Sequence, residues 1–165
     1  MGAPRTPRSG RRGAALTVAT VPTKLARQQI ASLRGKAKAS FLLAVEDIRR
    51  RGCAAAGVRL AGEALSGVCR LDLYGAWRLL TVFEEPDQCV LLIVAEHTRA
   101  ANPYRLLYSA LGIHEPEEPR TKPSCCDAEG QPPIDPDLVE RFERGLQDLS
   151  RTPHASPWAP TRRRR

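Results

Sequence analysis

The sequence predicts an α/β (α+β) fold, in which a small antiparallel or mixed sheet of about four strands packs on an N-terminal helical hairpin and carries a C-terminal extension. Three observations lead to this prediction. Residues 24–51 contain two successive stretches of helical periodicity. From residue 67 the apolar residues recur with a period of two, which is typical of strands. Residues 89–95 then form an uninterrupted apolar run of strand length.

The N-terminal half begins with a short β-prone segment, residues 14–22. Thr23 follows it and is placed to cap a first helix, whose apolar residues recur at helical spacing up to residue 33. A second helix is expected over residues 36–51, with Gly52 as its stop. Two amphipathic helices in succession favour a helical hairpin.

Three strands are expected to form a meander after these helices. The segments "VCRLDLY" and "AWRLLTVFEE" alternate in polarity, so successive side chains point to opposite faces. The sequence "EPDQ" supplies a turn, because Pro86 fixes φ at its second position. The strand "CVLLIVA" is apolar on both faces, which suits the middle of a small sheet covered on one side by the helices. A short helix is expected after Pro103, ending at Gly112.

Composition divides the chain into five segments. Residues 14–113 are the expected folded domain, residues 114–133 a Pro-rich acidic linker, and residues 134–150 an amphipathic helix that Asp135 caps. The basic tails, residues 1–13 and 151–165, have little to bury and are expected to be disordered.

The net charge of +8 is unevenly distributed. Residues 16–113 carry 13 basic and 8 acidic groups, whereas residues 114–158 carry 5 basic and 10 acidic groups. The amphipathic helix of residues 134–150 has nothing local to pack its apolar face on, so it must dock on the basic domain, on a second copy or on a partner. If it docks on the domain, it either completes the core as an ordinary extra helix or shields the domain in cis.

The cysteines are not expected to form disulfides. Their number is odd and no secretion signal precedes them, so most are expected to be buried small side chains; they are Cys53, Cys69, Cys89, Cys125 and Cys126. The last two lack the spacing of a metal site, so neither a metal nor a small-molecule cofactor is expected. No segment reaches the roughly 18 apolar residues of a membrane span, so no membrane contact and a cytoplasmic location are expected.

A cluster of cationic and titratable side chains is expected at one edge of the sheet. Arg70 and Arg78 lie on adjacent antiparallel strands, and His97 follows the end of the next strand. Tyr104 comes in the loop after it, with Arg99 between them. Two guanidinium groups can hold a phosphate bidentately, an imidazole can exchange a proton near neutral pH, and a phenol can donate a hydrogen bond or stack on a base.

These groups are what a metal-independent ribonuclease requires. The 2′-hydroxyl of RNA attacks once a base removes its proton, arginines stabilise the charge on phosphorus, and an acid protonates the leaving 5′-oxygen. Taken singly, such residues are more often ordinary surface or packing residues. The run Arg49, Arg50 and Arg51 is expected to be a solvated helix end, with contact to an RNA backbone as the alternative.

The span "GVCRLDLYGAWRLLTVFEEPDQCVLLIVAEHTRAANPY" resembles the second half of the RelE/ParE superfamily of bacterial toxins from type II toxin–antitoxin systems. In that family a basic strand leads into a "YRLVY"-like strand, and an apolar strand ends in a basic or His-containing loop before a tyrosine. The preceding strand and helices follow the family order too, so the resemblance covers residues 16–113, roughly.

The resemblance implies a toxin that cleaves messenger RNA at the ribosomal A site and is held by a cognate antitoxin. Arg70 matches the basic residue of the first strand, Arg78 the arginine of the second, His97 the catalytic loop position and Tyr104 the terminal tyrosine. Asp72 stands where toxins of the RelE branch often carry a second lysine.

Other family members rely on His and an acid, so Glu96 and Glu63 are secondary candidates for the base. Two alternatives stay open. ParE-branch relatives inhibit DNA gyrase and lack the nuclease residues, and in that case the arginines serve only as solvated charge. The other alternative is an RNA-binding module whose chemistry has decayed, for which Asp72 is the evidence.

Overall fold

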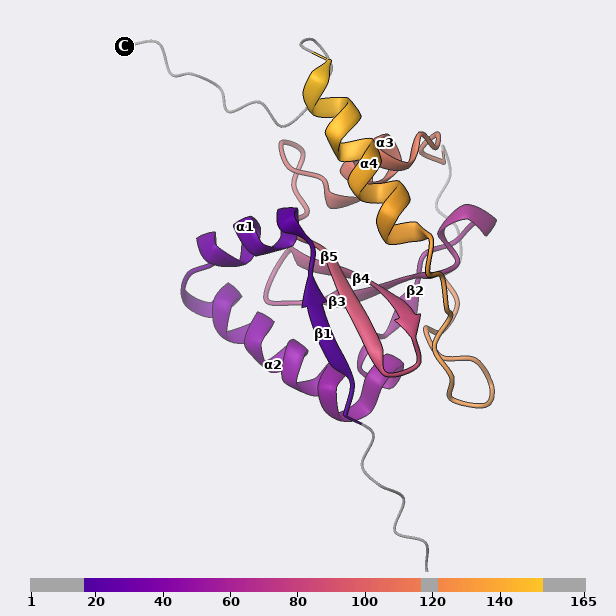
Figure 1. The fold of residues 1–165 in the computed structure, drawn as a ribbon. Coiled ribbons are helices and arrows are strands. Elements are labelled where there is room, and N and C mark those ends of the chain that lie inside the picture. Colours follow the sequence, from indigo (N-terminus) through magenta and orange to yellow (C-terminus); the bar gives the residue numbers. More distant parts are fainter. Residues whose placement is uncertain (1–16, 117–121, 153–165) are drawn as a thin grey trace, which may run out of the picture.

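The computed structural model describes residues 17–116 and 122–152 of the chain (Figure 1). The tails expected to be disordered are residues 1–13 and 151–165, of which residues 1–13 and 153–165 lie outside this part. Arg151 still belongs to a helix, so the start of the C-terminal tail was placed too early. No helix among the described residues is long and apolar enough to cross a membrane.

A five-stranded mixed sheet forms the centre of the molecule. Its strands are β1 (Ala19–Pro22), β2 (Val58–Arg59), β3 (Val68–Asp72), β4 (Trp77–Glu85) and β5 (Gln88–Glu96), in the spatial order β1-β5-β4-β3-β2. β1 runs parallel to β5, and the other neighbours are antiparallel. The α/β class is confirmed. The sheet has one strand more than expected because the two-residue β2 is too short to leave a periodic signal.

Four helices of the described chain pack on this sheet: α1 (Lys24–Ser32), α2 (Gly35–Arg51), α3 (Pro103–Leu111) and α4 (Leu138–Arg151). Two short 3₁₀ turns, η1 (Gly52–Ala55) and η2 (Glu63–Leu65), flank β2. Thr23 caps α1 by accepting a hydrogen bond from the Ala26 amide at 3.1 Å, as predicted. α1 packs on β5, and α2 on η1 and β1, so the expected hairpin is two consecutive helices that contact the sheet more than each other.

Alternating side chains give the sheet two buried faces. The first face packs against α2, where Phe41 and Ile48 meet Leu71 and Leu79. The second face packs against α3 and α4. Figure 1 shows α1 and α2 on one side of the strands and α3 with α4 on the other. The sequence predicted helices on one side only, because it left the docking place of the C-terminal helix open.

α4 completes the second core as an extra helix of the fold. Leu138 and Phe142 are fully buried there. Gly145 lets α4 approach α3 so closely that a Cβ at this position would lie 1.6 Å from the Ala110 carbonyl oxygen. The expectation that Asp135 caps this helix is wrong: α4 begins at Leu138 after Asp137, and Asp135 donates its backbone N–H to the Phe83 carbonyl of β4 at 3.0 Å.

Two disulfides fasten the segment before α4 to the domain. Cys53–Cys126 joins it to η1 and Cys69–Cys125 joins it to β3, across sequence separations of 73 and 56 residues. The expectation that the cysteines form no disulfides is therefore wrong. The partners are far apart in the sequence and are brought together only by the fold, so their spacing carries no signal.

Residues 122–135, which we call the disulfide arm, also pair with strands. Val58 forms a bridge with Ser124, and Phe83 forms one with Ile134. The expectation of a free linker over residues 114–133 is thus wrong for residues 122–133, which are fixed both covalently and by hydrogen bonds. Residues 117–121 lie outside the described part.

The disulfides predict a definite thiol count. Cys89 is the one free cysteine, and burial raises the pKa of its thiol to about 12, so it should not react in the native protein. Titration with a thiol reagent should find one thiol in denaturant without reductant and five after reduction. Reduction should also lower the free energy of unfolding, by about 4 kcal/mol for each disulfide broken, because each closes a long loop. The two losses together are smaller than their sum, because the two loops share residues. Five thiols in unreduced protein would contradict the pairing.

The contact of α4 with α3 predicts that Gly145→Ala destabilises the protein. Alanine favours a helix over glycine by about 1 kcal/mol, but its Cβ must push the two helices apart. Overpacking of this kind costs about 1–3 kcal/mol, so we expect a lower midpoint of denaturant unfolding. The exposed Ser150→Ala in the same helix is the control and should leave the midpoint unchanged or raise it slightly.

Candidate functional site

Strand register brings two arginines and an aspartate to one face of the sheet. Arg70 pairs with Leu80, and Asp72 pairs with Arg78. Paired residues share a face, and Leu80 belongs to the core under α3 and α4. The turn between the strands uses Gly75, whose φ of +61° lies in the left-handed region. The predicted adjacency of Arg70 and Arg78 is therefore confirmed.

Asp72 bridges the two guanidinium groups. Its Oδ1 lies 3.1 Å from Nε of Arg70 and 3.1 Å from Nε of Arg78, and its Oδ2 accepts from Nη2 of Arg70 at 3.2 Å. Arg78 also donates through Nη1 to the carbonyls of Gly75 and Trp77, at 3.1 and 2.9 Å. Each arginine side chain is only 21% exposed, whereas that of Asp72 is 56% exposed. Arg78 is thus held by backbone carbonyls as well as by Asp72, and the carboxylate is the more exposed partner of the three.

His97 and Tyr104 lie at the neighbouring end of the sheet. The His97 amide donates to the Ala76 carbonyl at 2.8 Å, which continues the β4–β5 ladder and puts His97 on the same face as Arg78. The ring centroids of His97 and Tyr104 are 5.1 Å apart, edge to face. Asn102 fixes the start of α3 by accepting from the Tyr104 amide at 3.0 Å. The Tyr104 hydroxyl is buried, with no hydrogen-bond partner among the described residues.

The disulfide arm adds a cation that sequence reasoning missed. Nζ of Lys122 lies 5.1 Å from the centroid of the Tyr104 ring. Partial burial lowers the pKa of Lys122 most, the positive charges of Arg70 and Arg78 lower it further, and Asp72 opposes them. No local pattern marks this lysine, because only the fold and the disulfides bring the arm to the site.

The two secondary base candidates do not join this cluster. Glu96 pairs with Trp77, so it faces the opposite side of the sheet from Arg78 and His97. Glu63 belongs to η2 and lines a separate hollow next to Arg59. Arg99 is exposed in the loop between β5 and α3, two residues beyond His97.

The arginine run at the end of α2 is largely engaged with neighbouring groups, as expected for a solvated helix end. Arg51 hydrogen-bonds Asp47 at 2.7 Å through Nε, and Arg50 lies 3.9 Å from Glu46. Arg49 donates to the Thr20 hydroxyl at 3.3 Å. These contacts neutralise two of the three charges.

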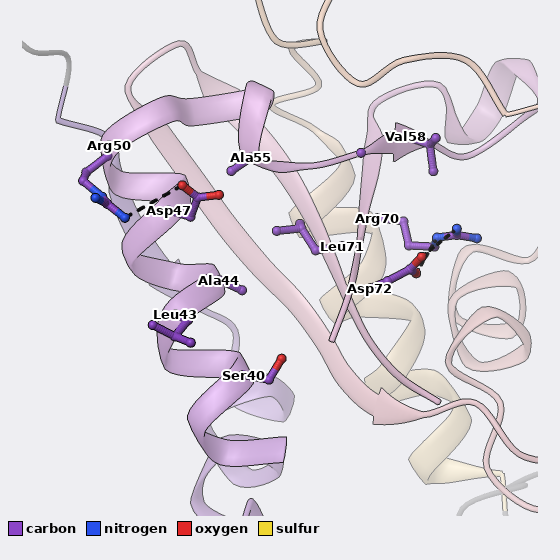
Figure 2. A pocket seen from close by; sticks show the side chains of 11 residues that line it. Ser40, Leu43, Ala44, Asp47, Arg50, Ala55, Val58, Arg70, Leu71 and Asp72 are labelled. Atoms are coloured by element: carbon purple, nitrogen blue, oxygen red, sulfur yellow. Dashed lines mark hydrogen bonds and ion pairs between the residues drawn. The ribbon is translucent and has the colours of Figure 1, made fainter. Parts of the chain in front are cut away.

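Of the three arginines, Arg50 also faces a groove that leads to the site. This groove, of about 560 Å³, separates α2 from β3 (Figure 2). Arg50 and Asp47 stand on its α2 wall. Figure 2 shows Leu71 pointing toward α2, while Arg70 and Asp72 lie on the other side of β3, joined by their ion pair.

The assembled site is cationic and suited to a phosphate. Arg70, Arg78 and Lys122 outnumber the single carboxylate of Asp72, and His97 stands at the open rim. Among the described residues, no three His, Cys, Asp or Glu side chains are grouped to hold a metal ion. No protein-family model, curated protein or solved structure matches this chain significantly.

Because Asp72 occupies both guanidinium groups, its neutralisation should strengthen anion binding. We expect Asp72→Asn to bind a fluorescent single-stranded oligonucleotide about 3- to 10-fold more tightly at low salt, measured by anisotropy. Asp87→Asn makes the same change of net charge in an exposed turn and is the matched control. Equal affinities of the two variants would show that Asp72 does not compete with the ligand.

Proposed function

We propose that this protein is a metal-independent endoribonuclease that cleaves messenger RNA, and that it acts as the toxin of a type II toxin–antitoxin pair. One observation carries the proposal: Arg70 and Arg78 are held side by side on one sheet face, next to His97 and Tyr104. The resemblance of residues 16–113 to RelE/ParE toxins supports it.

In the proposed mechanism the two guanidinium groups bind the non-bridging oxygens of a phosphodiester. The exposed Asp72 carboxylate swings away from them when the phosphate enters. The guanidinium groups then stabilise the charge that develops as the 2′-oxygen attacks phosphorus. Arg78 keeps its hydrogen bonds to the carbonyls of Gly75 and Trp77 when Asp72 moves, so its guanidinium group stays in place for this role.

Proton transfer falls to His97, since Glu96 and Glu63 lie elsewhere. Its imidazole is exposed at the rim. It takes the proton of the 2′-hydroxyl as the 2′-oxygen bonds to phosphorus, and it returns that proton to the 5′-oxygen as the bond between phosphorus and the 5′-oxygen breaks. Tyr104 holds the His97 ring by an edge-to-face contact. The Tyr104 hydroxyl is buried without a partner among the described residues, so it can donate a hydrogen bond to the RNA. Arg99, exposed in the loop beyond His97, extends the cationic surface on that side, where a longer RNA strand would run.

A second candidate function is RNA binding without cleavage. The observation that favours it is the Asp72 bridge. A carboxylate between the two arginines weakens the stabilisation that they can give to a phosphate in the transition state, so cleavage suffers. Both candidates use the same cations and differ in whether His97 transfers a proton.

The proposal also specifies the cellular location and the partner of the protein. The substrate is messenger RNA on the ribosome, so the protein acts in the cytoplasm and needs no small-molecule cofactor. A cognate antitoxin protein is the partner that restrains it.

The proposal predicts that His97→Ala and Arg78→Ala each slow message cleavage by about 100-fold or more, since each removes a group used in the transition state. The measurement is cleavage of one message in a coupled translation system and of the same message without ribosomes. His114→Ala and Arg27→Ala, both at exposed positions outside the site, are the matched controls and should cut like the wild type.

Uncut message with folded wild-type protein would end the nuclease proposal. If that protein still binds RNA through Arg78, the second candidate function, RNA binding without cleavage, is correct. If it does not bind RNA, a gyrase supercoiling assay tests the ParE-like alternative.

A further inference from the structure

The position of Lys122 depends on a covalent connection to the strand that carries Arg70. Cys125 follows Lys122 by three residues and is joined to Cys69, the direct neighbour of Arg70 on β3. The disulfide therefore ties the start of the arm to the strand that supplies the phosphate-binding arginine.

Within residues 17–116 and 122–152, few other contacts hold this end of the arm. The Arg59 amide donates to the Pro123 carbonyl at 2.9 Å, and Val58 bridges Ser124. Both contacts are with β2, a strand of two residues. The side chain of Lys122 itself is held over the Tyr104 ring. Such a short ladder gives little stability without the covalent link.

We propose that Lys122 is a third phosphate-binding cation of this site and that the two disulfides hold it in place, so that reduction by a dithiol withdraws it and weakens RNA binding. This inference rests on the proposed function, because the bound phosphate is that of RNA.

The charges around Lys122 favour the binding of a phosphate next to it. The exposed Lys122 lies over the Tyr104 ring, close enough to Arg70, Arg78 and Asp72 for their charges to act on it. Its protonated form is disfavoured there, mainly by burial and then by Arg70, which is why its pKa is lowered. A phosphate entering between these cations removes the mutual repulsion, and its affinity gains from all three charges.

The redox step is ordinary thiol–disulfide exchange. A thiolate of the dithiol attacks one sulfur of a disulfide and forms a mixed disulfide, and its second thiol then displaces the remaining cysteine. Each disulfide accepts two electrons and two protons and yields two cysteine thiols, while the dithiol becomes a cyclic disulfide. Cys126 is partly exposed, whereas Cys53, Cys69 and Cys125 are buried, so Cys53–Cys126 is expected to react first.

The chain offers a matched control for Lys122. Nζ of Lys36, at the start of α2, lies 5.3 Å from the centroid of the Tyr74 ring in the β3–β4 turn. This lysine–tyrosine pair is of the same kind and lies outside the disulfide arm. Lys36→Ala thus removes the same charge and the same type of ring contact from α2.

The experiment measures the affinity of a fluorescein-labelled single-stranded RNA by anisotropy, for oxidised protein and for protein reduced with dithiothreitol. The variants are wild type, Lys122→Ala, Lys36→Ala and Arg78→Ala, with thiol counts and circular dichroism to verify redox state and fold. We expect Lys122→Ala to weaken oxidised binding about 10-fold and to reduce the salt slope by about one, while Lys36→Ala has less than about a twofold effect. Reduction should weaken the wild type to the same extent and leave Lys122→Ala unchanged.

Three results would overturn the inference: a Lys122→Ala affinity equal to that of Lys36→Ala, a reduced wild type that binds as well as the oxidised one, or an equal effect of reduction on wild type and Lys122→Ala. If full reduction unfolds the protein, the double variant Cys69→Ser, Cys125→Ser keeps the other disulfide and should bind like Lys122→Ala. Unfolding of that variant as well would also overturn the inference, because the link would then be a condition of folding.

Failure of the proposed function gives a different pattern. In that case the oxidised wild type binds RNA no better than Arg78→Ala, whatever Lys122 does.

Discussion

The register of β3, β4 and β5 is the constraint on which the rest of the structure depends. β4 and β5 are buried on both faces, so a slip of one residue would turn Arg78 into the core under α2 and expose Leu79. The ladder is irregular between Leu80 and Thr81, and the extra residue of β5 lets Leu92 and Ile93 both face the second core. Hydrophobic packing on two sides therefore fixes which charged side chains meet at the end of the sheet.

The site is a balance of charges and not simply a positive patch. Asp72 holds Arg70 and Arg78 in place when no anion is bound, which spares two largely buried guanidinium groups from facing each other without a counter-ion. The same carboxylate must move before a phosphate can bind. Asp72 thus orders the two arginines but lowers their affinity for an anion. The positive charge of Lys122 acts in the opposite direction and favours the anion.

The acidic extension is part of the domain in two different ways. Its helix supplies Leu138 and Phe142 to the second core, so the sheet is covered on both sides. Its disulfide arm supplies Lys122 to the cationic site. The extension has a net negative charge, but it contributes a positive group to the cationic site. The electrostatic potential at the site depends on which charges lie close to it and not on the average composition of the segment.

Local chemistry in the sequence accounts for most of the helices and strands and for the alternation of their side chains. Thr23 as a cap, Gly52 as a stop and the two faces of residues 68–83 all follow from local backbone and side-chain chemistry. Tertiary structure alone decided the disulfide pairing, the short strand β2, the docking of α4 and the approach of Lys122 to Tyr104. Each of these joins residues far apart in the chain, and no periodicity or spacing records a contact that only packing creates.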